Sequence, residues 1–334
     1  MYRAVVRNHA KLAYNSVAAW LDGEGPEPVA VTAVPGLAEN IRLQQSVSER
    51  LDQFRQEQGA LNFQTIEAKA VFEENQIVDL RVEQRNSAKL IIEVFMISAN
   101  TTNAKFLEGH KFPSIRRVVR KPKRWDRIVE VAKEYSFVLP PYPNAKALNE
   151  FLLLEKASDP LRFPDLSLTI IKLLGSGEYV AEKPGREAPG HFGLAVKDYT
   201  HSTAPNRRYP DLITQRLLKA TLNNERTPYS FEELEVLAAH LTKQEDIATK
   251  AERQVNKSAA ALLLKSKIGQ YFDAFVTGAA EKGTWVRLID LPVEGKLVRG
   301  FAGLDVGDRV TVELISVNVE LGYIDFAKPK KVKR

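Results

Sequence analysis

Residues 191–212 read HFGLAVKDYTHSTAPNRRYPDL, and this stretch decides which fold and which site the chain builds. It predicts a short strand, a loop that contains Pro205, and a helix that opens with Arg207 and Arg208. Backbone amides at a helix N-terminus favour anions, and an arginine there adds a planar fork that suits a phosphate group. The stretch therefore predicts an anion site at the start of a helix over residues 207–222.

The two arginines do not easily serve one phosphate, because adjacent residues of a helix point about 100° apart. Asp211 lies three residues after Arg208 and four after Arg207, so either arginine is a candidate for an ion pair with Asp211. Spacing alone leaves both roles, phosphate contact and ion pair, open for each arginine.

Outward from this stretch, the pattern predicts mixed α and β structure. We expect a strand at 3–7 and a hairpin of 67–72 with 77–83 around Asn75. The expected helices lie at 10–21, 36–60, 87–107, 124–135, 145–156, 165–174, 207–222 and 230–266.

Short β-patterned runs dominate the chain after residue 266. They lie at 271–277, 283–289, 296–301, 309–317 and 323–327. Five strands in about 60 residues are typical of a small closed barrel such as an OB-fold. The fold class is therefore α+β, with a mixed α/β domain over 1–266, a barrel domain over 267–328 and a basic tail over 329–334.

The composition excludes several classes of protein. The chain has 334 residues, 48 Lys and Arg against 42 Asp and Glu, a net charge of +6, five histidines and no cysteine. The lack of cysteine excludes disulfide scaffolds, thiolate metal sites and a cysteine nucleophile. No apolar run approaches the roughly 20 residues that span a bilayer, and residues 1–12 do not resemble a signal peptide. We expect a cytoplasmic protein without a membrane partner.

The positive charge is concentrated in two places. Residues 111–124 contain seven Lys and Arg and no acid, and residues 328–334 contain five basic residues. Runs of one sign are suited to a phosphate backbone, although a solvated loop and a frayed terminus would have the same composition. We treat Arg120, within the first run, as a candidate RNA contact.

Aromatic residues and cations occur together in the predicted barrel. An OB-fold binds single-stranded nucleic acid by stacking bases on aromatic rings beside cations. Trp285 and Arg287 are two residues apart and share a face of one strand, whereas Phe272 shares a face with Ala274 on another. One face of each strand must fill the barrel, so at least one aromatic is core. Phe272, Trp285 and Arg287 are candidate RNA contacts.

Several motifs, in the same order, resemble those of the ribonuclease II and ribonuclease R exoribonucleases, the RNB family. The opening stretch resembles the family signature, a HFGL strand followed by Y.hfTSPIRRYpDL. Three further segments match family motifs: HAKLAY at 9–14, AKLIIEVFMISAN at 88–100 and KAER at 250–253. The barrel resembles the RNA-binding fold named after ribosomal protein S1, in KGTWVRL at 282–288 and LDVGDRV at 304–310. The resemblance implies that residues 1–266 form part of an RNB-type catalytic domain.

The resemblance implies a function and assigns residues to it. Family members degrade single-stranded RNA from the 3′ end by metal-assisted hydrolysis and release nucleoside 5′-monophosphates. Arg207 matches the arginine at the scissile phosphate, Glu252 a glutamate near the terminal nucleotide, and Tyr14 an aromatic that stacks on the 3′-terminal base. The same motifs make His191, Tyr199 and Arg208 candidate RNA contacts.

Simpler roles remain open for two of these residues. Tyr14 has helical spacing from Val17, which is also compatible with a core position. Glu252 is also compatible with an ordinary exposed glutamate, but its neighbours one helical turn away, such as Val255 and Asn256, include no cation to pair with it.

The aspartate cluster with which the family binds Mg²⁺ has no match in this sequence. In the family it precedes the position at which this chain begins, so we expect the metal ligands on an upstream segment or a separate chain and none here. Three hypotheses remain: part of an exoribonuclease, a noncatalytic RNA-binding protein derived from the family, and an RNA-binding module that keeps the signature for folding.

Overall fold

A computed structural model of the chain describes residues 1–64, 68–74, 76–82, 85–186, 189–280 and 283–329. The described α-helices are α1 (Tyr14–Leu21), α2 (Val29–Thr32), α3 (Leu37–Glu57), α4 (Ser87–Gly109), α5 (Trp125–Glu134), α6 (Ala145–Ser158), α7 (Phe163–Leu174), α8 (Tyr209–Leu222) and α9 (Phe231–Leu264). The described strands are β1 (Ala68–Glu73), β2 (Gln76–Val82), β3 (Ser114–Val118), β4 (Glu178–Glu182), β5 (Tyr271–Ala280), β6 (Gly283–Leu288), β7 (Glu294–Arg299), β8 (Arg309–Asn318) and β9 (Tyr323–Ala327). Short 3-10 helices lie at η1 (Phe192–Leu194) and η2 (Lys265–Lys267).

The chain packs into two compact units, and each is described by itself. The first unit comprises 1–63, 85–159 and 167–244, and the second comprises 64–84, 160–166 and 245–334. The second unit therefore contains the predicted barrel together with the end of α9 and the β1–β2 hairpin. The units differ from the domain boundary expected near residue 266, because packing joins segments that are distant in sequence.

The helices at the start of the first unit pack through one small core. Val17 and Trp20 of α1, Val31 of α2, Ile41 of α3 and Ala88 of α4 are buried together. Asn86 caps α4, because its side chain accepts a hydrogen bond from the backbone N–H of Lys89 at 3.0 Å. α3 and α4 confirm the helices predicted at 36–60 and 87–107.

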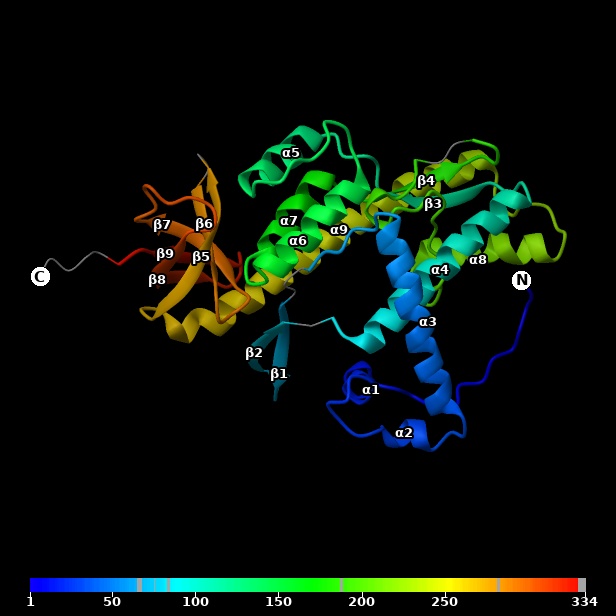
Figure 1. The fold of residues 1–334 in the computed structure, drawn as a ribbon, viewed down its shortest axis with the longest axis horizontal. Coiled ribbons are helices and arrows are strands. Elements are labelled where there is room, and N and C mark those ends of the chain that lie inside the picture. Colours follow the sequence, from blue (N-terminus) through cyan, green and yellow to red (C-terminus); the bar gives the residue numbers. More distant parts are fainter. Residues whose placement is uncertain (65–67, 75, 83–84, 187–188, 281–282, 330–334) are drawn as a thin grey trace, which may run out of the picture. The chain divides into compact units, whose positions relative to one another are not determined.

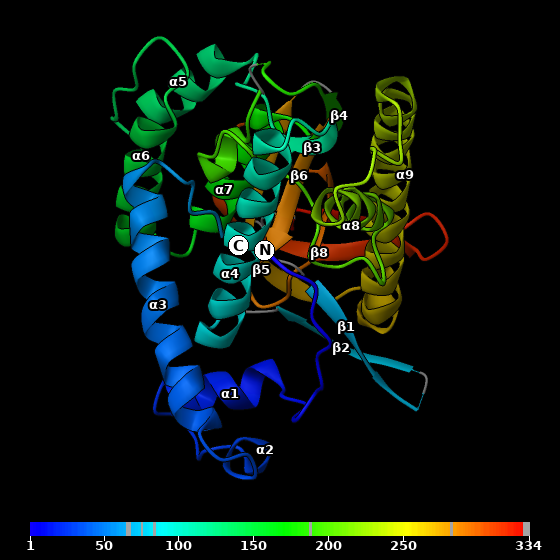
Figure 2. The same cartoon turned by 90° about the vertical axis from the view of Figure 1, so that its right-hand side faces the viewer.

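The scaffold of the candidate site is a two-stranded sheet flanked by helices. β3 and β4 pair antiparallel, and α4 and α8 pack beside β3 (Figures 1 and 2). Leu107, Ile115, Ile213 and Leu217 are fully or almost fully buried in the core between these elements. We did not predict either strand, because β3 lies within the basic run 111–124 and its arginines mask the apolar pattern.

One predicted strand is absent, and one predicted helix begins after the two arginines of the signature. Residues 3–7 form no strand, and Tyr2, Val5 and Val6 are exposed. A strand needs partner backbone groups for its hydrogen bonds, and no described strand pairs with this segment. The helix predicted at 207–222 begins at Tyr209, so Arg207 and Arg208 lie in the preceding turn and at the N-cap position.

The second unit contains a closed barrel with strand order β5-β6-β7-β9-β8 (orange to red in Figure 1). Its strands confirm the five predicted runs, and β7 and β9 pair in parallel. The side chains of Val286, Leu297, Val312 and Phe326 are buried inside. The predicted hairpin is present as β1–β2; Asn75, at its turn, and residues 330–334 of the predicted tail lie outside the described residues.

In the described part of the chain, no helix combines the length and the apolar character that crossing a membrane requires.

Candidate functional site

The structure separates the roles of the two adjacent arginines. Arg208 donates a hydrogen bond of 2.8 Å from its guanidinium to Oδ1 of Asp211, whose side chain is fully buried. The same oxygen accepts the backbone N–H of Ala204 at 2.9 Å. Arg208 is therefore the arginine that pairs with Asp211, and its charge is balanced inside the protein. Of the two roles left open by the spacing, the structure shows the ion pair, and the RNA contact of Arg208 stays a prediction.

Arg207 lies one residue before the N-cap of α8 and is exposed. Its backbone N–H donates to the carbonyl of Ala204 at 3.2 Å. Its guanidinium has no hydrogen bond or ion pair to any residue that the structure describes. Arg207 is thus a cation available to an external anion, next to the amide end of a helix.

Four aromatic rings form a chain that joins the segment before this turn to β4. Neighbouring rings meet edge to face with centroid distances of 5.5 Å for His191 and Tyr199, 5.7 Å for Tyr199 and His201, and 5.7 Å for His201 and Tyr179. Tyr199 is only 5% exposed, and its hydroxyl accepts a hydrogen bond from Asn100. The ring predicted as an RNA contact thus faces inward, which its position in the motif could not show.

Both histidines of this chain of rings are neutral at neutral pH. Burial, reinforced by the Arg117 charge, lowers the pKa of His191 to about 4. Burial, reinforced by Arg208 and Arg117, lowers the pKa of His201 to about 3. Nδ1 of His191 accepts the backbone N–H of Leu194, and Nδ1 of His201 shares a 2.8 Å hydrogen bond with the Tyr179 hydroxyl. Neither ring supplies positive charge to an anion at neutral pH.

The basic run 111–124 is largely committed to internal interactions. Arg116 of β3 is 1% exposed and meets Glu182 of β4 at 3.1 Å, an ion pair without the alignment of a hydrogen bond. Arg117 lies over the Tyr179 ring at 4.9 Å. Arg120 is exposed but pairs with Glu178. Part of the run is thus a strand whose arginines have internal partners, and Arg120, the predicted RNA contact, is paired with Glu178.

Tyr14 and Glu252 are both exposed. Tyr14 begins α1 and is 49% exposed, so the alternative of a core residue is wrong. Glu252 lies on α9 and has no ion pair with the residues that the structure describes. Arg207 belongs to the first compact unit and Glu252 to the second, so the two predicted catalytic residues come from separately packed parts of the chain.

Of the three predicted barrel contacts, Trp285 is an aromatic ring on the outward side of its strand. Trp285 and Arg287 alternate with the buried Thr284 and Val286, as predicted from the period of the strand. Trp285 pairs with Lys296 across β6 and β7. A Cβ at Gly283 would lie 3.3 Å from the indole and 2.8 Å from Cε of Lys296, so this glycine leaves room for both side chains.

The other two predicted barrel contacts have internal partners. Arg287 forms a two-pronged ion pair with Asp165, at 2.9 Å from Nε and 2.6 Å from the terminal nitrogen. Phe272 packs against the barrel core and meets Phe326 edge to face at 6.5 Å. Arg287 is therefore neutralised and Phe272 is a core-facing aromatic, which leaves Trp285 with Lys296 as the platform.

The described residues do not form a metal site. No group of three or more His, Cys, Asp or Glu side chains among them could hold a metal ion. Asp211, the fully buried carboxylate of the signature, is engaged by Arg208 and Ala204. The residues present do not fit a Mg²⁺ ion.

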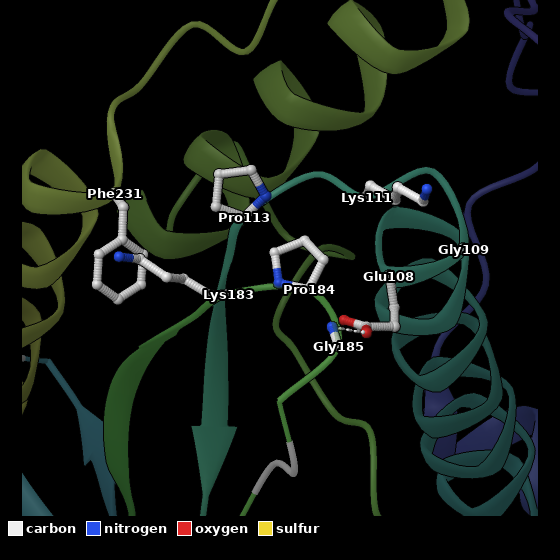
Figure 3. Close-up of a pocket in the computed structure, with 8 residues that line it drawn as sticks. All are labelled: Glu108, Gly109, Lys111, Pro113, Lys183, Pro184, Gly185 and Phe231. Atoms are coloured by element: carbon white, nitrogen blue, oxygen red, sulfur yellow. Dashed lines mark hydrogen bonds between the residues drawn. The ribbon is translucent and has the colours of Figure 1, made fainter.

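A shallow, open hollow of about 650 Å³ lies elsewhere in the first unit (Figure 3). Nζ of Lys183 lies 4.1 Å above the Phe231 ring, and Glu108 accepts the N–H of Gly185 at 2.7 Å. The other lining residues are Gly109, Lys111, Pro113 and Pro184. The hollow has no pair of acids and no nucleophile, so we assign it no part in the site.

Sequence reasoning missed the side chains that hold this site together. Asn100 and His201 occur within the quoted motifs, but nothing in their spacing revealed their partners. Arg117 was treated only as one charge of a basic run. Asp211 was identified correctly from its spacing to the arginines.

Comparison with known proteins extends these observations. Residues 1–224 match the model of the RNB domain, and residues 270–328 match that of the RNase II-type exonuclease C-terminal S1 domain. The whole chain is 29% identical to ribonuclease R of Aquifex aeolicus and spans 50% of its length. Ribonuclease R of Escherichia coli is 30% identical over 98% of this chain, which spans 43% of that protein. The chain therefore spans half or less of these relatives.

A solved structure has the same fold. Mycoplasma genitalium RNase R in complex with ribose methylated single-stranded RNA matches 95% of this chain with a TM-score of 0.81 and 21% identity. The match covers 53% of that protein.

Proposed function

The chain belongs to the RNB family of ribonuclease II-type exonucleases, and on this basis we propose that it is the RNA-holding part of a 3′-to-5′ exoribonuclease. In this proposal the enzyme hydrolyses single-stranded RNA to nucleoside 5′-monophosphates. The observation that carries the proposal is Arg207, an exposed arginine without an internal partner among the described residues, which the family signature places at the scissile phosphate.

The residues of this chain have separate tasks in the proposed reaction. Arg207 binds the phosphate whose negative charge grows in the transition state, and a fixed cation at that position lowers the barrier. Tyr14 offers an exposed ring for the terminal base, and Trp285 with Lys296 offers a stacking platform for an upstream base. Glu252 assists near the terminal nucleotide. His191 and His201 are neutral, and in this proposal they have a packing role and transfer no proton.

In this proposal the reaction uses Mg²⁺, and the ion is bound by residues outside this chain. Because the described residues do not fit the ion, we derive no step through it. We propose that its aspartate ligands lie on an upstream segment or a separate chain, which would be the partner of this one besides single-stranded RNA. The alternative is a noncatalytic protein of the same family that binds single-stranded RNA.

The test combines this chain with the aspartate-bearing segment and supplies Mg²⁺ and single-stranded RNA labelled at its 5′ end. A ladder that shortens from the 3′ end supports the exoribonuclease. RNA that is bound but stays intact supports the noncatalytic alternative, and RNA that is neither bound nor cut contradicts both.

Two substitutions separate catalysis from binding. Arg207→Ala is expected to lower turnover more than RNA affinity, because its contact strengthens as charge develops. Trp285→Ala is expected to weaken RNA binding about tenfold with turnover of bound RNA preserved. Arg226→Ala, which removes an exposed arginine beyond the far end of α8, is the matched control. Equal effects of both variants on affinity and turnover contradict this assignment.

A further inference from the structure

Ser202 is the most completely engaged residue of the loop that leads to Arg207. Its backbone N–H and its hydroxyl both donate to Oδ1 of Asn100, at 3.0 and 2.7 Å. Its hydroxyl accepts from Asn103 at 2.7 Å, and its carbonyl accepts from Gln215 at 2.7 Å. All backbone and side-chain polar groups of Ser202 are therefore bonded to side chains of α4 and α8. Ser202 and Asn100 are fully buried.

Ala204, two residues further along, is fixed in the same way. Its N–H donates to the buried Asp211 at 2.9 Å. Its carbonyl accepts the N–H groups of Arg207 and Arg208, at 3.2 and 2.9 Å. Hydrogen bonds thus hold the loop at Ser202 and again at Ala204, two residues further along the backbone, and those of Ala204 reach the turn that ends in Arg207.

We propose that Asn100 is a positioning residue for Arg207: it holds Ser202 so that the turn presents the guanidinium of Arg207 to a phosphate of the bound RNA. This inference rests on the proposed function. The side chain of Arg207 has no partner among the described residues, so no side-chain contact fixes its position. Its position is set by its backbone, which is hydrogen-bonded to Ala204, and Ala204 follows the anchored Ser202 by two residues.

The position of Asn100 suits this task. One buried oxygen accepts two hydrogen bonds, while the amide nitrogen donates to the Tyr199 hydroxyl at 3.3 Å, which fixes the orientation of the amide. Loss of this oxygen leaves the Ser202 N–H buried without an acceptor, so the loop must rearrange to find another. A rearranged loop loses the preorganisation on which the phosphate contact of Arg207 depends.

The test is a double-mutant cycle of Asn100→Ala and Arg207→Ala, measured as the affinity for a 5′-labelled single-stranded RNA by fluorescence anisotropy. Each single variant is expected to weaken binding about fivefold. The double variant is expected to bind no more weakly than Arg207→Ala alone, because Asn100 acts through Arg207. Thr101→Val, at the next residue of α4, is the matched control. The hydroxyl that it removes has no hydrogen-bond partner among the described residues, so RNA affinity is expected to stay unchanged.

A rescue variant distinguishes positioning from general stabilisation. Asn100→Asp keeps an acceptor oxygen for Ser202 and is expected to bind RNA more tightly than Asn100→Ala. Hydrogen exchange of the Ser202 amide should be slow in the wild type and in Asn100→Asp and fast in Asn100→Ala. If Asn100→Ala does not fold, Ser202→Ala, which removes a single hydroxyl, replaces it in the cycle.

Additive effects in the cycle, or unchanged affinity in a folded Asn100→Ala protein, would overturn the positioning role. If the wild-type protein binds RNA in the same experiment, the proposed function stands without that role. A wild-type protein that does not bind RNA contradicts the proposed function itself, and this inference with it.

Discussion

Arg207 and Arg208 are adjacent, but their surroundings give them different tasks. Arg208 balances the charge of Asp211, which is fully buried, whereas Arg207 is exposed. Removing one partner of a buried ion pair leaves an uncompensated charge, so Arg208→Ala should lower the free energy of unfolding by about 3 kcal/mol. Arg207→Ala should change it by less than about 0.5 kcal/mol, as for most surface substitutions.

Urea unfolding of both variants beside the wild type measures this difference. A destabilised Arg207→Ala protein, or an unaffected Arg208→Ala protein, would show that the two arginines have been assigned the wrong way round.

The histidines of the aromatic chain predict an acid-sensitive fold. Burial lowers the pKa of His191 to about 4 and that of His201 to about 3, whereas the ordinary pKa of unfolded histidine is about 6.5. Between these limits the unfolded state binds more protons than the native state, so stability is complete above pH 6.5 and declines as the pH falls towards 4.

Urea unfolding measured between about pH 7.5 and about pH 4.5 covers most of this window. The free energy of unfolding should depend less on pH in the double variant His191→Gln with His201→Gln than in the wild type. His240→Gln, which replaces an exposed histidine, is the control and should follow the wild-type curve. Identical curves for all three proteins would contradict the assignment to His191 and His201.

At the scale of elements, β7 depends on a glycine that faces the barrel core. A Cβ at Gly295 would lie 2.5 Å from the Phe326 ring and 2.6 Å from the carbonyl of Ile324. Because the ring and the backbone have no space to move in a packed barrel, Gly295→Ala should lower the free energy of unfolding by at least about 2 kcal/mol.

Gly278→Ala in β5 is the matched control, because its Cβ would meet Trp285 at 3.5 Å, an ordinary contact distance. Thermal unfolding of the two variants compares them directly. Equal melting temperatures would show that β7 tolerates a side chain at this position.

Neither strand of the β3–β4 sheet is predicted by the sequence, and the chemistry of β3 explains why its pattern is hidden. A strand is recognised by alternation of apolar and polar residues, but β3 places Arg116 in the interior beside Glu182 and Arg117 against the Tyr179 ring. Charged residues with internal partners look like surface residues in a sequence. These two partners, both on β4, are more than 60 residues away.

At the level of domains, the C-terminal segment of the second compact unit begins at residue 245, within α9, and not at the first strand of the barrel. Ala260, Ala261 and Leu264 of α9 are buried in the same core as the strands. A fragment of residues 245–334 should therefore be more stable than one of residues 267–334, by about 3 kcal/mol for the apolar groups that the shorter fragment leaves out.

Thermal and urea unfolding of the two fragments tests this. Both lack the β1–β2 hairpin and its buried Leu80, so the comparison isolates the contribution of α9. Equal stability would show that the barrel folds independently from residue 267, at the boundary expected from the sequence.

The sequence by itself determined the features that depend on near neighbours. The periodicity of residues 36–60, 87–107 and 271–327 specified long helices and a five-stranded barrel, because hydrophobic period and turn residues act over a few positions. The signature at 191–212 indicated the family and selected Arg207, and the three-residue spacing of Arg208 and Asp211 anticipated their ion pair.

Tertiary packing, in contrast, determines which of the candidate residues have internal partners. Arg287 is neutralised by Asp165, 122 residues away, and Ser202 is held by Asn100, 102 residues away. Tyr199 has an aromatic ring of the kind that stacks on bases, but the ring is buried like that of a core residue. A side chain's availability depends on the charges and surfaces that packing brings to it from distant parts of the chain, and local sequence does not contain that information.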